Sequence, residues 1–409
     1  MQTRLTEQTL ASPSGAQAES ILRRCVHCGF CNATCPTYQL SGNELDGPRG
    51  RIYLIKQMLE GASTTELTRQ HLDRCLTCRS CETTCPSGVQ YSHLLEIGRE
   101  HIDRVTTRAR GERVLRRLLR YVLPETKRVR WALRVAPYVR GLMPKALAAA
   151  LPEAPSRASN TQWPAARHTR RMLALTGCVQ PATQPQIDAA AARLLDRRGI
   201  SLLRVHGGGC CGALSHHLNA AGEARAQMVR NIDAWWPDVE QGVEAIVSTS
   251  SACSVMLKDY GRLLGYDVEY GEKAKRISAL VADASAVLSS LPRFEATQVA
   301  PAKRRISFHA PCSLQHGLRG HKEVERLLHE HNYELTAVRD PHLCCGAAGT
   351  YSIQQPELSR QLRANKLAAL QAGAPTVIAT ANIGCLLHMQ QTASVPVKHW
   401  LELLDEAER

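Results

Sequence analysis

Aromatic residues are scarce in this chain of 409 residues: Phe, Trp and Tyr together make up 4%, and only three residues are Phe. Its hydrophobic cores must therefore be built from Leu, Ala, Val and Ile. No stretch approaches eighteen apolar residues, so we expect no transmembrane helix. Residues 1–20 contain no apolar run that would form the core of a signal peptide. These absences predict a cytoplasmic protein in a reducing environment.

A nucleotide-binding fingerprint is also missing. The most glycine-rich stretch, GGGCCG at 207–212, does not match the G-x-G-x-x-G pattern of dinucleotide-binding folds. We therefore expect any flavin or nicotinamide chemistry to take place on another chain. The length is sufficient for two or three domains, each with its own core.

Cysteine, by contrast, is abundant, and all sixteen residues fall into four groups of four. Two groups are compact and nearly identical: Cys25, Cys28, Cys31 and Cys35, then Cys75, Cys78, Cys81 and Cys85. Two are spread out and resemble each other: Cys178, Cys210, Cys211 and Cys253, then Cys312, Cys344, Cys345 and Cys385. In a reducing setting this usage favours metal ligation over disulfides. Thiolates gathered in fours are the ligands that iron–sulfur clusters require.

Both compact groups fit the pattern C-x2-C-x2-C-x3-C-P. Three closely spaced cysteines hold one cubane, while the fourth, next to the proline, ligates the other cluster of a two-cluster protein. The first [4Fe-4S] cluster is therefore assigned Cys25, Cys28, Cys31 and Cys85. The second is assigned Cys75, Cys78, Cys81 and Cys35. Zinc, the competing metal, favours two separated CxxC pairs instead.

The surroundings of the compact groups predict a helical two-cluster ferredoxin domain over residues 18–105. Ile52, Ile55 and Leu59 follow Pro48 at helical spacing, which predicts a helix that ends at Gly61. The segment LEIGREHIDRV after the second group predicts another helix.

A strongly basic helical connector is expected over residues 106–168. From position 99 to 145 there are fourteen Lys or Arg against four acidic residues, or +10 of the total net charge of +14. Apolar residues at helical spacing make this segment amphipathic, which favours contact with an anionic membrane surface or an acidic partner subunit. A solvated linker helix is the alternative. We expect no nucleic-acid partner, because no recognition motif accompanies the charge.

The remainder is an internal repeat, with copies at 169–295 and 303–409. In both copies the first and second cysteines are 32 positions apart, and the third and fourth are 42 and 40 positions apart. Short aliphatic runs precede the cysteines, and helical patterns lie between them. The repeat therefore predicts two α/β units whose cysteines lie at the carboxyl ends of parallel strands. The whole chain is expected to be an α+β multidomain protein.

Each copy contains a Cys-Cys-Gly sequence, in which Gly212 or Gly346 permits the bend that two adjacent thiolates need to face one site. Metal ligation is the obvious use of such a pair, and a buried redox-silent pair is the alternative. Whether the repeats hold a further iron–sulfur cluster stays open at this point. His206, His309 and His342 lie near these cysteines as candidate ligands or quinone-site donors, or as hydrogen-bonded loop residues.

The paired motifs, the GPRGRI segment and the two CCG repeats together resemble the iron–sulfur subunits of glycolate dehydrogenase, also called glycolate oxidase. The resemblance covers essentially the whole chain and is most specific over residues 25–61. Iron–sulfur subunits of anaerobic glycerol-3-phosphate dehydrogenase, lactate-utilisation proteins and heterodisulfide reductase also contain CCG domains. The domain alone therefore does not fix the substrate.

The resemblance implies a complex in which FAD-binding partner subunits oxidise glycolate to glyoxylate, and also similar acids such as D-lactate. This chain would carry electrons from the flavin through its clusters to a membrane quinone or another acceptor. It would thus be an enzyme subunit with no catalytic residue or substrate site of its own. It would lie peripherally on the cytoplasmic face of the inner membrane.

The chain departs from the fullest CCG pattern, which ends in a CxxC pair. Ser250 and Asn382 occupy the first position of that pair, so each repeat offers four thiolates rather than five. This departure argues against a self-contained reductase of the heterodisulfide type, in which five cysteines hold an unusual cluster.

Overall fold

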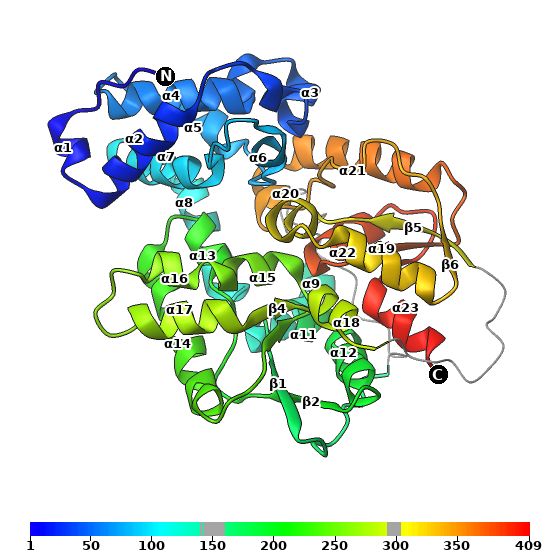
Figure 1. Cartoon of the computed structure of the whole chain (residues 1–409). Helices are drawn as coiled ribbons and strands as arrows, with labels where there is room; N and C mark the ends of the chain where they lie inside the picture. Colours follow the sequence, from blue (N-terminus) through cyan, green and yellow to red (C-terminus); the bar gives the residue numbers. More distant parts are fainter. Residues whose placement is uncertain (140, 142–159, 293–303) are drawn as a thin grey trace. The chain divides into compact units, whose positions relative to one another are not determined.

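The computed structural model describes residues 1–139, 141, 160–292 and 304–409 (Figure 1). These residues form two compact units: Met1–Arg116 with His342–Lys366, and Arg117–Pro341 with Leu367–Arg409. The first is built from helices and turns, and the second contains two four-stranded parallel sheets. The predicted α+β multidomain class is confirmed. Among the described residues, no helix combines the length and the apolar character needed to cross a bilayer.

Helices dominate the first unit. They are α1 (Glu7–Leu10), α2 (Pro13–Arg24), α3 (Pro36–Ser41), α4 (Pro48–Leu59), α5 (Glu66–Asp73), α6 (Ser80–Thr84), α7 (Tyr91–Val105), α20 (Tyr351–Gln354) and the first part of α8 (Arg110–Val122). The predicted helix after Pro48 and the one after the second cysteine group are α4 and α7.

The core of this unit lies where α2, α4 and α7 meet. Leu22, Ile55 and Leu94 come from these three helices and are completely buried. Helices α4 and α7 approach closely because Gly98 has no side chain: a Cβ there would lie 2.7 Å from Cγ1 of Ile55. This packing fixes the scaffold from which the cysteine loops project.

The second unit contains both sheets, whose strand orders are β2-β1-β3-β4 and β6-β5-β7-β8. The first sheet consists of β1 (Arg170–Ala174), β2 (Ile200–Arg204), β3 (Ile246–Ser248) and β4 (Val281–Asp283). The second consists of β5 (Arg304–His309), β6 (Tyr333–Leu335), β7 (Val377–Thr380) and β8 (Val397–His399). All pairings are parallel. The sequence repeat is thus a repeat of sheet topology, and β4 and β8 are additional to the strands expected before the cysteines.

Helices precede, connect and follow these strands, and parallel pairing requires such connections. In chain order they are α9 (Thr126–Val139), α11 (Gln180–Thr183), α12 (Gln186–Asp196), α13 (Ala213–His217), α14 (Ala221–Glu240), α15 (Ser251–Lys258), α16 (Tyr260–Leu263), α17 (Gly271–Leu280), α18 (Ala284–Ser290), η4 (Ser313–Leu318), α19 (His321–Glu330), α22 (Ile383–Gln390) and α23 (Trp400–Ala407), with α21 (Pro356–Gln371) entering from the first unit. Buried Trp235 and Trp400 anchor the cores of the two repeats.

Candidate iron–sulfur sites

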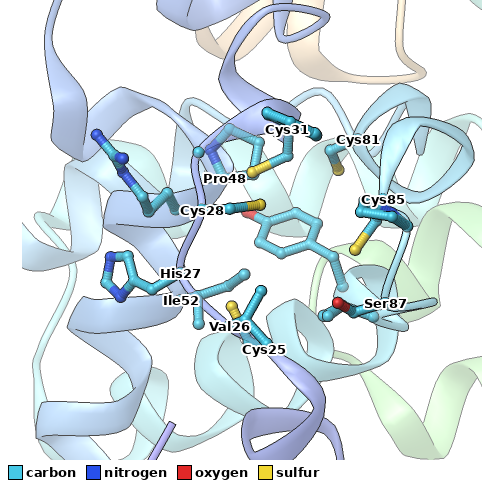
Figure 2. Close-up of a pocket in the computed structure, with 16 residues that line it drawn as sticks. Cys25, Val26, His27, Cys28, Cys31, Pro48, Ile52, Cys81, Cys85 and Ser87 are labelled. Atoms are coloured by element: carbon cyan, nitrogen blue, oxygen red, sulfur yellow. The ribbon is translucent and has the colours of Figure 1, made fainter.

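The first compact cysteine group lines a cavity together with two cysteines of the second group. Figure 2 shows Cys25, Cys28, Cys31 and Cys85 around this cavity. Cys28 is exposed to solvent, and the cavity is therefore close to the protein surface. Three of these residues precede η1 (Phe30–Asn32) or lie in it, and Cys85 follows α6.

A second cavity is lined by Cys75, Cys78, Cys81 and Cys35. The first cavity is also lined by Cys81, so it combines three cysteines of the first group with two of the second, whereas the second cavity combines three cysteines of the second group with the last cysteine of the first. Pro48, Cys81 and Tyr91 line both cavities and form the wall between them. Two redox centres held here would be direct neighbours.

The two cysteine loops share an unusual backbone conformation. His27 and Gly29 have φ angles of 61° and 89°, and the corresponding Thr77 and Arg79 have φ angles of 52° and 63°. Three of these four residues carry side chains, for which the left-handed region is unfavourable. Such strain is characteristic of functional sites, where the backbone is held to present groups inward. The same two left-handed positions recur in both loops, which fits two clusters of one type.

Loss of protons from the cysteine thiols is unfavourable at the first cavity. Burial, followed by the charge of Cys25, raises the pKa of Cys31 to about 11. Thiolates packed this closely repel each other unless a cation is placed among them. The donor set therefore fits a cationic iron–sulfur core, whose binding would release protons from the thiols.

A buried ion network lies beside the second cavity. The Arg51 side chain is 1% exposed, and its guanidinium lies 3.7 Å from the carboxylate of Asp46. Asp46 also contacts Nδ1 of His71 at 2.8 Å and the guanidinium of Arg74 at 3.0 Å. Sequence patterns gave no indication of this network, because its members come from three separate segments.

The four cysteines of the first CCG repeat also converge. Cys210 accepts hydrogen bonds from the thiols of Cys178 and Cys211, which lower its pKa, and Cys211 is in turn hydrogen-bonded to Cys253. These residues follow β1, β2 and β3, so they meet at the carboxyl edge of the sheet. The repeat thus presents a four-thiolate set within a single compact unit.

Two buried polar residues hold the first CCG loop in place. Asn231 accepts a hydrogen bond from the N–H of Gly209 and donates one to the carbonyl of Cys210, each 2.8 Å long. The hydroxyl of Tyr260 donates to the carbonyl of Cys211, also at 2.8 Å. Sequence analysis missed both residues, since one polar side chain in a helix carries no recognisable pattern.

The second CCG pair belongs to the same compact unit as the two ferredoxin-type cavities. Cys344 and Cys345 are buried, and the N–H of Gly346 lies 3.4 Å from Sγ of Cys344. Gly346 has a φ of 87°, and a Cβ there would lie 2.6 Å from a backbone oxygen, so no larger residue fits the bend. Seven residues along the chain from Cys344, the buried Tyr351 donates a hydrogen bond of 3.1 Å to the carbonyl of Arg74, the residue before Cys75.

The remaining cysteines of the second repeat, Cys312 and Cys385, belong to the other compact unit. Cys312 precedes η4 after strand β5, and Cys385 lies in α22 after β7. Of the candidate histidines, His206 is exposed and His309 is buried at the end of β5.

The positions that depart from the five-cysteine pattern face each other within the second unit. Ser250 and Asn382 are buried N-caps of α15 and α22, and Nδ2 of Asn382 lies 3.4 Å from Oγ of Ser250. The N–H of Ser251 also donates to the carbonyl of Ala381. Both positions therefore serve the contact between the repeats, where their side chains satisfy each other.

Comparisons with known proteins agree with this geometry. The family described as "4Fe-4S dicluster domain" matches residues 21–89, and the family described as "Cysteine-rich domain" matches residues 172–258 and 306–390. The chain is 49% identical to the glycolate oxidase iron-sulfur subunit of Escherichia coli (strain K12), over 100% of this chain and 99% of the relative.

More distant relatives are consistent with that match. A probable glycolate oxidase iron-sulfur subunit of Bacillus subtilis (strain 168) is 30% identical over 95% of this chain and 94% of its own length. Lactate utilization protein A of the same organism is 25% identical, but the match covers only 56% of this chain.

Proposed function

The chain belongs to the family of glycolate oxidase iron–sulfur subunits, and on this basis we propose that it conducts electrons from an FAD-binding partner subunit that oxidises glycolate to glyoxylate. As a member of this family it is an iron–sulfur, electron-transferring subunit of an oxidoreductase. The partner would also accept related 2-hydroxy acids such as D-lactate. The electrons would leave towards a membrane quinone or another acceptor.

The observation that carries the proposal is the pair of adjacent cavities, each of which is lined by the four cysteines assigned to one cluster. In the proposed mechanism, Cys25, Cys28, Cys31 and Cys85 hold one cubane, and Cys75, Cys78, Cys81 and Cys35 hold the other. Such clusters supply one-electron redox chemistry. The chain's own contribution is to hold them next to each other across a thin wall and to bring one of them close to the surface.

A third cluster is proposed at the first CCG repeat, with Cys178, Cys210, Cys211 and Cys253 as its ligands. The hydrogen-bonded thiols already lie together, and four ligands suffice for a conventional cluster. A heterodisulfide-type reductase is disfavoured, because Ser250 and Asn382 are engaged with each other. A cluster that also involves the second repeat would have Cys312, Cys344, Cys345 and Cys385 as candidate ligands.

Peripheral contact with the cytoplasmic face of the inner membrane is proposed through the exposed side of α9 and the end of α8. Trp131 and Tyr138 are 66% and 88% exposed, and Tyr121 is 59% exposed with Arg128 stacked 3.8 Å above its ring. Exposed aromatic residues among arginines suit the interface of an anionic bilayer. Other arginines of the basic segment form ion pairs inside the protein instead of facing solvent.

Arg108 illustrates this internal use of the basic charge. It is 7% exposed and contacts Asp73 at 2.6 Å and Asp103 at 2.8 Å. The basic segment therefore divides into a part that joins the protein core and the exposed aromatic part described above.

A vesicle-binding measurement tests the membrane contact. We expect the purified protein to sediment with vesicles that contain anionic phospholipid, and the Trp131→Ala/Tyr138→Ala variant to lose at least tenfold in affinity. Leu67→Ala, which removes an exposed apolar residue from α5, is the matched control. Equal binding by all three proteins would contradict the proposed surface. Salt-sensitive binding of an acidic partner subunit, without vesicle binding, would favour a protein partner instead.

The electron-transfer function is tested on the purified complex. We expect two interacting [4Fe-4S] signals in electron paramagnetic resonance after dithionite reduction, together with glycolate-dependent dye reduction. Cys28→Ser and Cys78→Ser should each abolish dye reduction, whereas Leu67→Ala should not. Stoichiometric zinc without acid-labile sulfide, or full activity after loss of both cubanes, would contradict the proposed function.

A further inference from the structure

A buried arginine distinguishes the second cavity from the first. Arg51 lies in α4, lines the second cavity and is 1% exposed. Its Nε donates a 2.7 Å hydrogen bond to the carbonyl of His71, and both terminal nitrogens lie 3.2 Å from the hydroxyl of Thr37. That hydroxyl in turn contacts Sγ of Cys35 at 3.3 Å. The guanidinium is therefore one side chain away from a proposed cluster ligand.

The negative charge nearest to Arg51 is shared with other groups. Asp46 is 3.7 Å from Arg51 but only 3.0 Å from Arg74 and 2.8 Å from Nδ1 of His71. One carboxylate thus faces two guanidinium groups, and the network retains an excess of positive charge beside the cavity. Because Arg51 is buried, that charge is screened far less than a surface charge would be.

The cation that lines the first cavity is placed differently. Arg49 is two positions from Arg51 in the same helix, yet its side chain is 34% exposed. It forms a close ion pair of its own with Glu44, at 2.6 Å. The half-buried amino group of Met1 also donates to the carbonyl of Cys25. Solvent and the partner carboxylate weaken the field that Arg49 exerts on the first cavity.

Burial acts against reduction of a cluster. Adding one electron and no proton makes a four-thiolate cluster more negative, and a site removed from water stabilises that charge poorly. The second set of assigned ligands is the more enclosed one: two of its four cysteines are buried and none is exposed, whereas in the first set only Cys25 is buried and Cys28 is exposed. Without a compensating cation it would be the poorer electron acceptor.

We propose that Arg51 is the residue that raises the reduction potential of the second cubane, and thereby allows electrons to enter the more enclosed of the two sites. The inference rests on the proposed function, because it requires a cluster at Cys75, Cys78, Cys81 and Cys35. Arg51 acts as a positioning and tuning residue through its charge and touches no substrate.

Redox titration of the purified complex, followed by electron paramagnetic resonance, tests this role. The signal of the second cubane is identified as the one that Cys78→Ser removes. In Arg51→Met we expect that signal to show at least a tenfold lower ratio of reduced to oxidised cluster at a fixed potential, a shift of about 59 mV for a one-electron couple. Arg49→Met, the matched control, should shift neither signal by more than a third of that amount.

Two further variants separate charge from structure. Arg51→Lys keeps the charge and loses the fork of hydrogen bonds, so it should retain most of the wild-type potential. Asp46→Asn removes the opposing charge and should shift the potential upward. If Arg51→Met fails to load its clusters, the opposite behaviour of Asp46→Asn and the retained potential of Arg51→Lys still test the proposal.

Contradicting results are equally specific. An unchanged potential in loaded Arg51→Met, an equal fall in Arg51→Lys, or a downward shift in Asp46→Asn would overturn the role of Arg51. Wild-type protein that lacks iron and sulfide at the compact cysteines would instead overturn the proposed function on which the inference rests.

Discussion

Replacement of Cys211 by Ser is predicted to remove one complete cluster from the chain without affecting the two cubanes. Cys211 is 3% exposed and is hydrogen-bonded to both Cys210 and Cys253, so it lies at the centre of the four-thiolate set. A serine hydroxyl is a poor replacement for a thiolate ligand of iron. The remaining three cysteines would leave the site one ligand short.

The expected change follows from the ligand count. A [4Fe-4S] cluster at Cys178, Cys210, Cys211 and Cys253 contributes about four iron atoms and four sulfides per chain, and Cys211→Ser should lose them together. Iron and acid-labile sulfide are measured on purified wild-type and variant protein. Spectra of the dithionite-reduced samples should keep the interacting signals of the two cubanes, because those ligands belong to the other compact unit.

Tyr260→Phe is the matched control for this experiment. It removes the hydroxyl that donates to the carbonyl of Cys211 but leaves all four thiols in place. We expect it to retain the iron and sulfide content of the wild type. Unchanged iron content in Cys211→Ser would refute the third cluster and show that these thiols are a buried, hydrogen-bonded group. Loss of iron from all sites in both variants would indicate general misfolding instead.

Two further predictions concern stability. Burial alone raises the pKa of Glu408, but its contacts with His331 and two arginines outweigh burial and hold the pKa at about 2. Glu408→Gln should therefore lower the free energy of unfolding by about 3 kcal/mol at pH 7, since one pKa unit corresponds to about 1.4 kcal/mol. This contribution is present above about pH 4.5 and is lost as the pH falls towards 2, so urea denaturation should show a smaller difference in stability between wild type and Glu408→Gln in acid. Equal stabilities of the two proteins at pH 7 would contradict the prediction. Gly98→Ala should destabilise the chain by about 1–3 kcal/mol because the new Cβ would lie 2.7 Å from Ile55, whereas Gly111→Ala meets nothing within 4 Å and should not. Thermal denaturation compares the two glycine variants, and equal effects would contradict the close packing of α4 and α7.

The two ferredoxin-type cavities are alike in sequence but differ in surroundings. Both loops share the same left-handed backbone positions, which the repeated spacing imposes. One cavity nevertheless lies near solvent at Cys28, and the other lies beside the buried charge of Arg51. Similar ligand sets can therefore differ in potential, and such a difference gives a two-cluster relay a direction.

Tyr351 connects the second of these cavities with the CCG part of the chain. Burial is the main cause that raises its pKa, and the charges of Cys75 and Cys344 contribute in the same direction. A neutral phenol next to thiolates from both groups places the second CCG pair close to the second cavity within the first unit.

Several features of this protein are determined by the sequence alone. The spacing of Cys25, Cys28, Cys31 and Cys35, repeated at 75–85, is enough to predict two neighbouring four-cysteine sets, because short loops leave few ways to gather three thiolates. Helix α4 was equally predictable from Pro48 and the apolar spacing that follows it. The duplicated α/β topology followed from the nearly equal distances between cysteines in the two repeats.

Tertiary structure alone decided how these parts are used. The repeat left the use of the two CCG pairs open, and the structure places Cys210 and Cys211 in one compact unit and Cys344 and Cys345 in the other. Burial and long-range contacts cause this difference, and they involve partners far apart along the chain, such as Tyr351 with Arg74. The environment of Arg51 has the same origin. Local spacing determines which ligands can gather, whereas packing determines the charge and the neighbours that each gathered set experiences.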